Sequence, residues 1–193
     1  EYYESGEIKS ISNYFCGTMQ GNFYYYREDG TLDTIDFYNA GRMMFSQSFN
    51  NNQTLSEIAY FDEKWIKGKN YKINRTIEFY ENGDYKSETE VEEKEDGYKY
   101  ENYREYYPNG FLKIVNILIE GNKHGICYEY YENGNVKQVG CYEYDKPVYV
   151  QLFYNENGTP QKIETWKKGK LIKSENGFDP KKSFKYKLKK YKD

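Results

Sequence analysis

Residues that could perform acid–base, nucleophilic or metal chemistry are few and scattered in this chain of 193 residues. The one histidine, His124, lies in a glycine-rich segment at 121–125, where we expect an ordinary turn residue. A catalytic triad or a histidine-based metal site would need partner residues that the sequence does not offer. No phosphate-binding glycine motif occurs either. We therefore expect no catalytic residue, no metal and no cofactor.

The three cysteines, Cys16, Cys127 and Cys141, suggest no chemistry of their own. Their odd number predicts no disulfide framework, and their spacing fits no zinc pattern. We interpret them as small buried hydrophobic residues.

An acidic stretch near the middle of the chain has two interpretations. Its members are Glu88, Glu90, Glu92, Glu93, Glu95 and Asp96. They could bind cations or a basic partner. Their alternation with Thr89 and Val91 is also typical of the solvated face of a strand and its loop. No pair of carboxylates stands out as the acid and base of a glycosidase, so the sequence does not indicate an enzyme.

The C-terminal segment 179–193 alternates lysine with apolar side chains. Lys185, Lys187 and Lys189 interleave with Phe184, Tyr186 and Leu188, which predicts a terminal capping strand with a lysine face. Such lysines protect a sheet edge from pairing with other chains. They would equally form a basic patch for nucleic acid or an acidic protein surface.

The composition favours β-structure with a thin core. Tyrosine occurs 25 times, aromatic residues make up 20% of the chain, and the mean hydropathy is −1.08. Disordered chains are poor in aromatic residues, so the low hydropathy does not indicate disorder. The net charge of −3 argues against non-specific binding to nucleic acid, and no apolar run reaches the length of a membrane span.

A short motif recurs along the chain: two aromatic residues, two or three polar residues, a glycine, and an apolar residue two positions later. Six copies end at a glycine, and a degenerate seventh has glutamine in its place. These positions are Gly6, Gly30, Gln53, Gly83, Gly110, Gly134 and Gly158, separated by 24, 23, 30, 27, 24 and 24 residues. Regular internal spacing of this kind is typical of a repeat architecture.

Each copy predicts a β-hairpin, because Asn-Gly or Asp-Gly between alternating runs favours a tight primed turn. The copies at Gly30 and Gly158 have one more polar residue, so we expect longer turns there. Around Gly134 we expect Tyr131 to face Val136 and Tyr130 to face Lys137. Glycine-rich segments at 17–21, 121–125 and 168–170 would link successive hairpins. The sequence thus predicts an all-β, elongated, open antiparallel meander of about seven hairpins in one solenoid-like domain over 1–193.

These residues resemble the bacterial variant of the MORN repeat. The best match is 121–137, where Gly-Asn-Lys-His-Gly precedes Tyr-Tyr-Glu-Asn-Gly-Asn-Val-Lys. The resemblance covers nearly the whole chain and is strongest over 1–38 and 100–172. Proteins with such repeats include the YwqK-type antitoxins, so the resemblance implies a module that binds and neutralises a protein. The residue usage also suggests an AT-rich bacterium or its phage.

We therefore expect a non-enzymatic, protein-binding repeat module that uses a tyrosine-rich face. The candidate contact residues on it are Tyr25, Tyr106, Tyr128, Tyr130 and Phe153. One alternative is a nucleic-acid or ribonucleoprotein binder, such as a phage inhibitor of a host nuclease, acting through the terminal lysines. Another is an exported structural or cell-surface protein. The chain starts inside a repeat without methionine, so cytoplasmic and exported locations both stay open, as does the oligomeric state.

Overall fold

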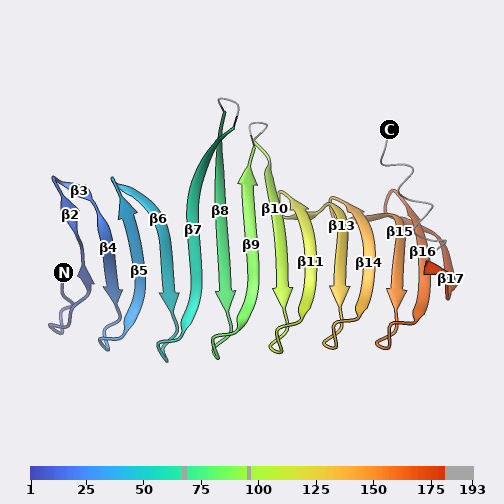
Figure 1. The fold of residues 1–193 in the computed structure, drawn as a ribbon, viewed down its shortest axis with the longest axis horizontal. Coiled ribbons are helices and arrows are strands. Elements are labelled where there is room, and N and C mark those ends of the chain that lie inside the picture. Colours follow the sequence, from blue (N-terminus) through green and yellow to red (C-terminus); the bar gives the residue numbers. More distant parts are fainter. Residues whose placement is uncertain (67–68, 95–96, 181–193) are drawn as a thin grey trace. The chain divides into compact units, whose positions relative to one another are not determined.

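The computed structural model describes residues 1–66, 69–94 and 97–180, and its elements there are β-strands (Figure 1). The chain divides into two compact units, Glu1–Asn102 and Tyr103–Asp193. No helix among the described residues is long and apolar enough to cross a membrane. The predicted capping strand, with Lys185, Lys187 and Lys189, lies almost entirely outside the described residues.

The first unit is an antiparallel meander. Its sheet runs in the order β1-β4-β5-β6-β7-β8-β9, and β2 pairs with β3 as a separate ribbon. The strands are β1 (Ser10–Ile11), β2 (Tyr14–Phe15), β3 (Thr18–Met19), β4 (Gly21–Tyr26), β5 (Leu32–Asn39), β6 (Arg42–Phe49), β7 (Leu55–Ile66), β8 (Lys69–Phe79) and β9 (Tyr85–Glu93). The division between the units falls within β10 (Lys99–Tyr106).

The second unit repeats the same plan. Its order is β11-β13-β14-β15-β16-β17, with the short β12 paired to β11. The strands are β11 (Leu112–Ile119), β12 (Asn122–Lys123), β13 (Gly125–Tyr130), β14 (Val136–Glu143), β15 (Lys146–Tyr154), β16 (Pro160–Lys167) and β17 (Lys170–Asn176). The prediction of an all-β antiparallel meander built from hairpin repeats is confirmed.

The seven motif turns share one geometry. In each, the NH of the opening residue donates to the carbonyl four residues on at 2.8–2.9 Å. The NH of the fourth residue then donates back to the opening carbonyl at 2.8–3.0 Å. The openers are Tyr3, Arg27, Asn50, Tyr80, Tyr107, Tyr131 and Asn155. We number the hairpins first to seventh in this order.

The predicted tight primed turn is therefore wrong at these sites, as are the longer turns expected at Gly30 and Gly158. All seven turns have the same length; in those two copies the aromatic pair has moved one residue upstream instead. From the second hairpin on, the residue before the fourth position is Asp or Asn, as at Asn133. In these six turns its side chain accepts the backbone NH two residues later at 2.9–3.1 Å. This local bond favours the wider turn.

Positive φ at the fourth position explains the glycines. Gly134 has φ of 83°, and Gln53 in the degenerate copy takes φ of 62°. Left-handed backbone costs a non-glycine residue roughly 1 kcal/mol, so losing this glycine does not abolish the turn.

The register differs by one residue from the predicted pairing at the sixth hairpin. Tyr130, not Tyr131, pairs with Val136, because Tyr131 opens the turn and a bulge follows Glu129. The same pairing joins each pre-turn aromatic to the residue six positions on. The pairs given by the structure are Tyr2–Ile8, Tyr26–Leu32, Phe49–Leu55, Phe79–Tyr85, Tyr130–Val136 and Tyr154–Pro160.

At the opposite ends of the strands, five of the links that the structure describes are two-residue turns with the primed geometry, whereas Lys94 and Gly97 make the bonds of the wider turn before β10. Both central residues of these five turns have positive φ, as a type I′ turn requires. The pairs are Cys16–Gly17, Ala40–Gly41, Glu120–Gly121, Tyr144–Asp145 and Lys168–Gly169. The linking turn predicted at 168–170 is confirmed. Those predicted at 17–21 and 121–125 begin one residue earlier, at 16–17 and 120–121, and strands occupy most of the predicted segments. The turns at 40–41 and 144–145 were not predicted, because neither has the paired or lysine-flanked glycine of the others.

Directly paired residues share a face of the sheet, which defines two faces. In the first unit, each face carries rows of residues that pair across the strands. Two such rows lie on face A, and one row, mostly apolar, lies on face B. The rows on face A are Tyr25-Thr34-Ser48-Glu57-Glu78-Ser87 and Phe23-Asp36-Ser46-Ala59-Thr76-Thr89. A row on face B is Tyr24-Ile35-Gln47-Ile58-Ile77-Glu88.

The same faces recur in the second unit by repeat position. Face A carries Cys127-Gly140-Gln151-Glu164, and face B carries Val115-Tyr128-Val139-Leu152-Ile163. The buried apolar residues of the chain include Phe23, Ile77, Val139 and Leu152, so the core is thin, as the composition indicated. Cys127 and Cys141 are buried as expected, whereas Cys16 is exposed and that interpretation was wrong.

Candidate binding groove

A glutamate, a lysine and a tyrosine recur together beside the motif turns. In the sixth hairpin Lys137 Nζ lies 2.6 Å from Glu129 Oε1 and 5.9 Å from the ring centre of Tyr131. In the fifth hairpin Lys113 lies 2.7 Å from Glu105 and 5.8 Å from the ring of Tyr107. We call this set the Glu-Lys-Tyr clasp. The hydrogen bond to Glu129 raises the pKa of Lys137, with a smaller contribution from the carboxylate charge.

The tyrosine of the clasp also ties its hairpin to the next one. Tyr107 Oη donates to the carbonyl of Tyr130 at 2.8 Å, and Tyr131 Oη donates to that of Tyr154 at 2.9 Å. Tyr3 makes the same bond to Tyr26 at 2.6 Å. The accepting carbonyl always belongs to the pre-turn aromatic of the following hairpin.

An arginine takes over this link in the second hairpin. Arg27 Nη2 donates to the carbonyl of Phe49, and Nη1 donates to the carbonyl of Leu32 at 2.8 Å. Asp33 holds the guanidinium at 2.7 Å. The inter-hairpin bond is thus kept although the tyrosine is not.

The third hairpin has lost all three members of the clasp. Ser48, Asn50 and Ser56 occupy the positions of the glutamate, the tyrosine and the lysine. The amide of Asn50 turns back into its own turn and donates to Thr54 Oγ1 at 3.0 Å. Three short side chains therefore stand where the fifth and sixth hairpins have three long ones, and face A is hollowed there.

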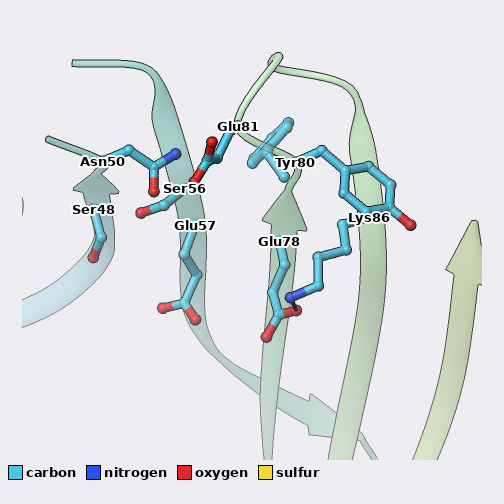
Figure 2. A pocket seen from close by; sticks show the side chains of 9 residues that line it. Ser48, Asn50, Ser56, Glu57, Glu78, Tyr80, Glu81 and Lys86 are labelled. Carbon is cyan, nitrogen blue, oxygen red and sulfur yellow. Dashed lines mark ion pairs between the residues drawn. The ribbon is translucent and has the colours of Figure 1, made fainter. Parts of the chain in front are cut away.

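Figure 2 shows the resulting groove, which has a volume of about 470 Å³. The third hairpin contributes its three short residues, and the next strands and turn contribute the other wall. The lining is Ser48, Asn50, Ser56, Glu57, Glu78, Phe79, Tyr80, Glu81 and Lys86. A second hollow of about 420 Å³ lies against the same turn, shares Asn50 and Glu81 with the groove and reaches Arg27.

The charge on the groove walls is predominantly negative. Glu57 and Glu78 are direct cross-strand partners, an arrangement that places like charges side by side. Glu78 is compensated by Lys86 at 3.1 Å and by the hydroxyl of Ser87 at 3.0 Å. The half-buried Glu57 side chain has no hydrogen bond or ion pair within the described part of the chain. The groove can therefore accept a cationic or hydrogen-donating group.

The residues predicted to form one tyrosine-rich face do not lie together. Tyr25 and Phe153 lie on face A, one position before the pre-turn aromatic of their hairpins. Tyr128 and Tyr130 lie on face B and stack on each other at 6.2 Å. Tyr106 holds the place of Tyr130 in its own hairpin, and all five are half-buried. Burial raises the pKa of Tyr130 and, together with the charge of Asp36, that of Tyr25. Their role in binding stays a prediction.

Of the other sequence candidates, His124 has a buried ring Nδ1 without a hydrogen-bond partner among the described residues. The acidic stretch forms part of β9, where Glu88 pairs with Arg75 at 2.7 Å, while Glu95 and Asp96 lie outside the described residues. His124 follows β12 and packs edge-on against Tyr144 at 5.3 Å. Over the described ranges, no three His, Cys, Asp or Glu side chains gather closely enough to hold a metal ion.

Sequence reasoning missed the groove, although a signal was present. The third copy was recognised as degenerate by its lost glycine, which the structure shows to be a minor change. The important change is the simultaneous loss of the charged and aromatic side chains at 48, 50 and 56. That loss becomes visible only when the copies are aligned on the turn opener.

Comparison with known families supports the repeat assignment. The model of the MORN repeat variant matches residues 1–15 and 123–144. These stretches contain the first and the sixth hairpin turns, two of the seven that share one geometry. No curated protein matches the chain. The chain is thus a β-hairpin repeat protein, and two of its stretches are similar to the MORN repeat variant.

Proposed function

We propose that this chain is a non-enzymatic module that binds a protein partner at the groove of the third hairpin. One observation carries the proposal: in the third hairpin all three clasp positions carry short polar side chains, Ser48, Asn50 and Ser56, and face A is hollowed there. Each of the three is too short for the clasp contacts, and the groove that results is open to solvent. Tyrosine is enriched at protein interfaces, and a surface hollow can receive an anchoring side chain of the partner.

The chemistry of the walls suggests what such a partner presents. Glu57, Glu78 and Glu81 outnumber Lys86, and the ring of Phe79 gives an apolar patch beside them. A segment with a basic residue next to an apolar one would complement both. The resemblance to YwqK-type antitoxins leads us to propose that binding neutralises the partner.

The test restores the clasp. The variant Ser48→Glu, Asn50→Tyr and Ser56→Lys fills the groove with the side chains that the fifth and sixth hairpins carry. We expect partner affinity to fall about tenfold or more, roughly 1.4 kcal/mol. The fold should gain about 1 kcal/mol from the restored contacts. A pull-down from the producing cells identifies candidate partners, and calorimetry with the purified partner measures the affinity.

The matched control makes the opposite exchange in the sixth hairpin. Glu129→Ser, Tyr131→Asn and Lys137→Ser should lower stability by a similar amount and leave partner affinity unchanged. If the filled variant binds as tightly as the parent chain, the groove is not the binding site. If the control alone loses binding, the site lies near the sixth hairpin instead.

A further inference from the structure

One carboxylate of the first unit is buried without a partner. Asp36, in β5, is 7% exposed, and its Oδ1 has no hydrogen bond in the described structure. Isolated buried charges are costly, and proteins normally pair them or bond them to donors. An unpaired carboxylate that is this deeply buried therefore suggests that a ligand from outside the chain provides its partner.

Aromatic rings surround this carboxylate on face A. Phe23 is its direct partner on β4, and its ring centre lies 4.8 Å from that of Tyr38, two residues further along β5. Tyr25 lies on the same face of β4, in the next row. Tyr14 packs edge-on against Phe23 at 5.5 Å. The remaining neighbour across the sheet is Ser46, on β6.

Burial and the negative charge of Asp36 affect the pKa values of two neighbouring tyrosines. Burial raises the pKa of Tyr38, and the negative charge of Asp36 raises it further; the same two causes act in the same order on Tyr25. Both hydroxyls therefore stay neutral at physiological pH. The site is a single carboxylate among neutral aromatic rings.

That combination matches one class of ligand group. A cation over aromatic faces gains about 0.5–2 kcal/mol from the ring quadrupoles, and a nearby carboxylate adds an ion pair. The ammonium of lysine is compact enough to reach a carboxylate that is only 7% exposed, whereas a planar guanidinium needs room to bond both oxygens. The alkyl stem of a lysine can also lie against apolar rings.

We infer that Asp36, with Phe23, Tyr25 and Tyr38, forms a binding site for an alkylammonium group, and that its occupant is a lysine side chain of the protein partner. The identity of the occupant rests on the proposed function. The carboxylate and the groove lie on the same face of the first unit, because Asp36 pairs with Ser46, two residues before the groove residue Ser48 on β6.

Tyr14 packs against the ring of Phe23 beside this carboxylate. It belongs to the β2–β3 ribbon, whose two strands pair only with each other, and its side chain is 62% exposed. The ribbon backbone is held by the bond from Gly41 NH to the carbonyl of Met19 at 2.9 Å, so the movement required is a rotation of the exposed Tyr14 ring. A lysine would reach the carboxylate by displacing the Tyr14 ring from Phe23.

The experiment titrates the full chain with Nα-acetyl-lysine methylamide while NMR follows the ring signals of Phe23, Tyr25 and Tyr38. We expect saturable shifts at millimolar probe, and no shifts from the same probe acetylated at Nε, which is neutral. Asp36→Asn should weaken binding at least tenfold. Asp33→Asn, on the same strand but at the surface, should leave it within about twofold.

Two outcomes would overturn the inference: equal shifts from the charged and the neutral probe, or unchanged affinity in Asp36→Asn. Circular dichroism and thermal unfolding of Asp36→Asn guard against a folding defect, since removal of an unpaired buried charge should not lower the melting temperature. If the probe fails while the filled-groove variant still loses its partner, the alkylammonium site is rejected and the proposed function stands.

Discussion

At the same repeat position, the first unit leaves a buried polar group without a hydrogen-bond partner, and the second unit provides partners for its buried polar group. In the first unit the row Phe23-Asp36-Ser46 leaves a buried carboxylate oxygen without a partner. In the second unit the corresponding row is Cys127-Gly140-Gln151. There Gln151, only 2% exposed, lies over the glycine, and its amide donates to the carbonyl of Cys141 at 2.9 Å. Its oxygen accepts from Gln138 at 3.2 Å.

The difference shows that one backbone position can serve either stability or binding. In the second unit, the side chain of Gln151 is buried and hydrogen-bonded within the chain at both its amide atoms, because Gly140 opposite leaves room for it. The first unit has an acid in place of that glycine and rings around it. A polar group left unsatisfied by its own chain is therefore a better indicator of a site than the aromatic residues by themselves.

We expect the largest loss of stability when Gly140, in the second-unit row, receives a side chain. A Cβ at residue 140 would lie 1.5 Å from Gln151 Oε1, so Gly140→Ala must displace the buried amide. We expect a loss of about 3 kcal/mol, measured by urea unfolding. Combining it with Gln151→Ala should cost less than the two single changes together, since both remove the same contact. Additive losses would contradict this explanation.

We expect a smaller loss of stability when the side chain of Gln151 is removed from the same row. Gln151→Ala leaves the carbonyl of Cys141 and the amide of Gln138 with one partner fewer, which should cost about 2 kcal/mol. Thermal unfolding measures it. The counterpart in the first unit, Asp36→Asn, should not destabilise the fold. Similar losses at both positions would mean that the two rows do not differ as we describe.

The smallest effect concerns tyrosine ionisation. Burial and the charge of Asp36 raise the pKa values of Tyr25 and Tyr38, so the folded chain holds these protons more tightly than the unfolded chain does. The stability from this source is present below about pH 10 and is lost as pH rises through the folded pKa values. Asp36→Asn should move both pKa values downward, as measured by NMR of the tyrosine rings. Unmoved values would place the carboxylate far from the hydroxyls.

The hairpins and their period could be predicted from sequence because they depend on local signals. Polar turn residues, a glycine with positive φ and flanking alternation recur in nearly every copy, and each signal acts within a few residues. The turn type was wrong because Asn-Gly was taken as the whole signal. The bond from the side chain of Asn133 to the NH of Asn135 selects the wider turn, and the pairing then moves by one residue.

The groove and the buried carboxylate could not be predicted, because both depend on register. Ser48, Asn50 and Ser56 are unremarkable residues until the pairing shows which long side chains they replace. Asp36 is one of 31 acidic residues, and nothing in its neighbours along the chain marks it as buried. Only the cross-strand row, which joins residues 13 positions apart such as Phe23 and Asp36, shows its surroundings.

The short side chain of Asn50 also affects where the first unit opens first during partial unfolding. Tyr3 bonds the first hairpin to the second, and Arg27 bonds the second to the third, but the amide of Asn50 bonds within its own turn. In arrays where each segment touches its neighbours, opening begins at the weakest junction. Backbone amides where β7 meets β8 near the turns, at residues 57–59 and 76–78, should therefore exchange with solvent through partial opening earlier than those of residues 125–130. A protease that cuts transiently opened chains would find its first sites there.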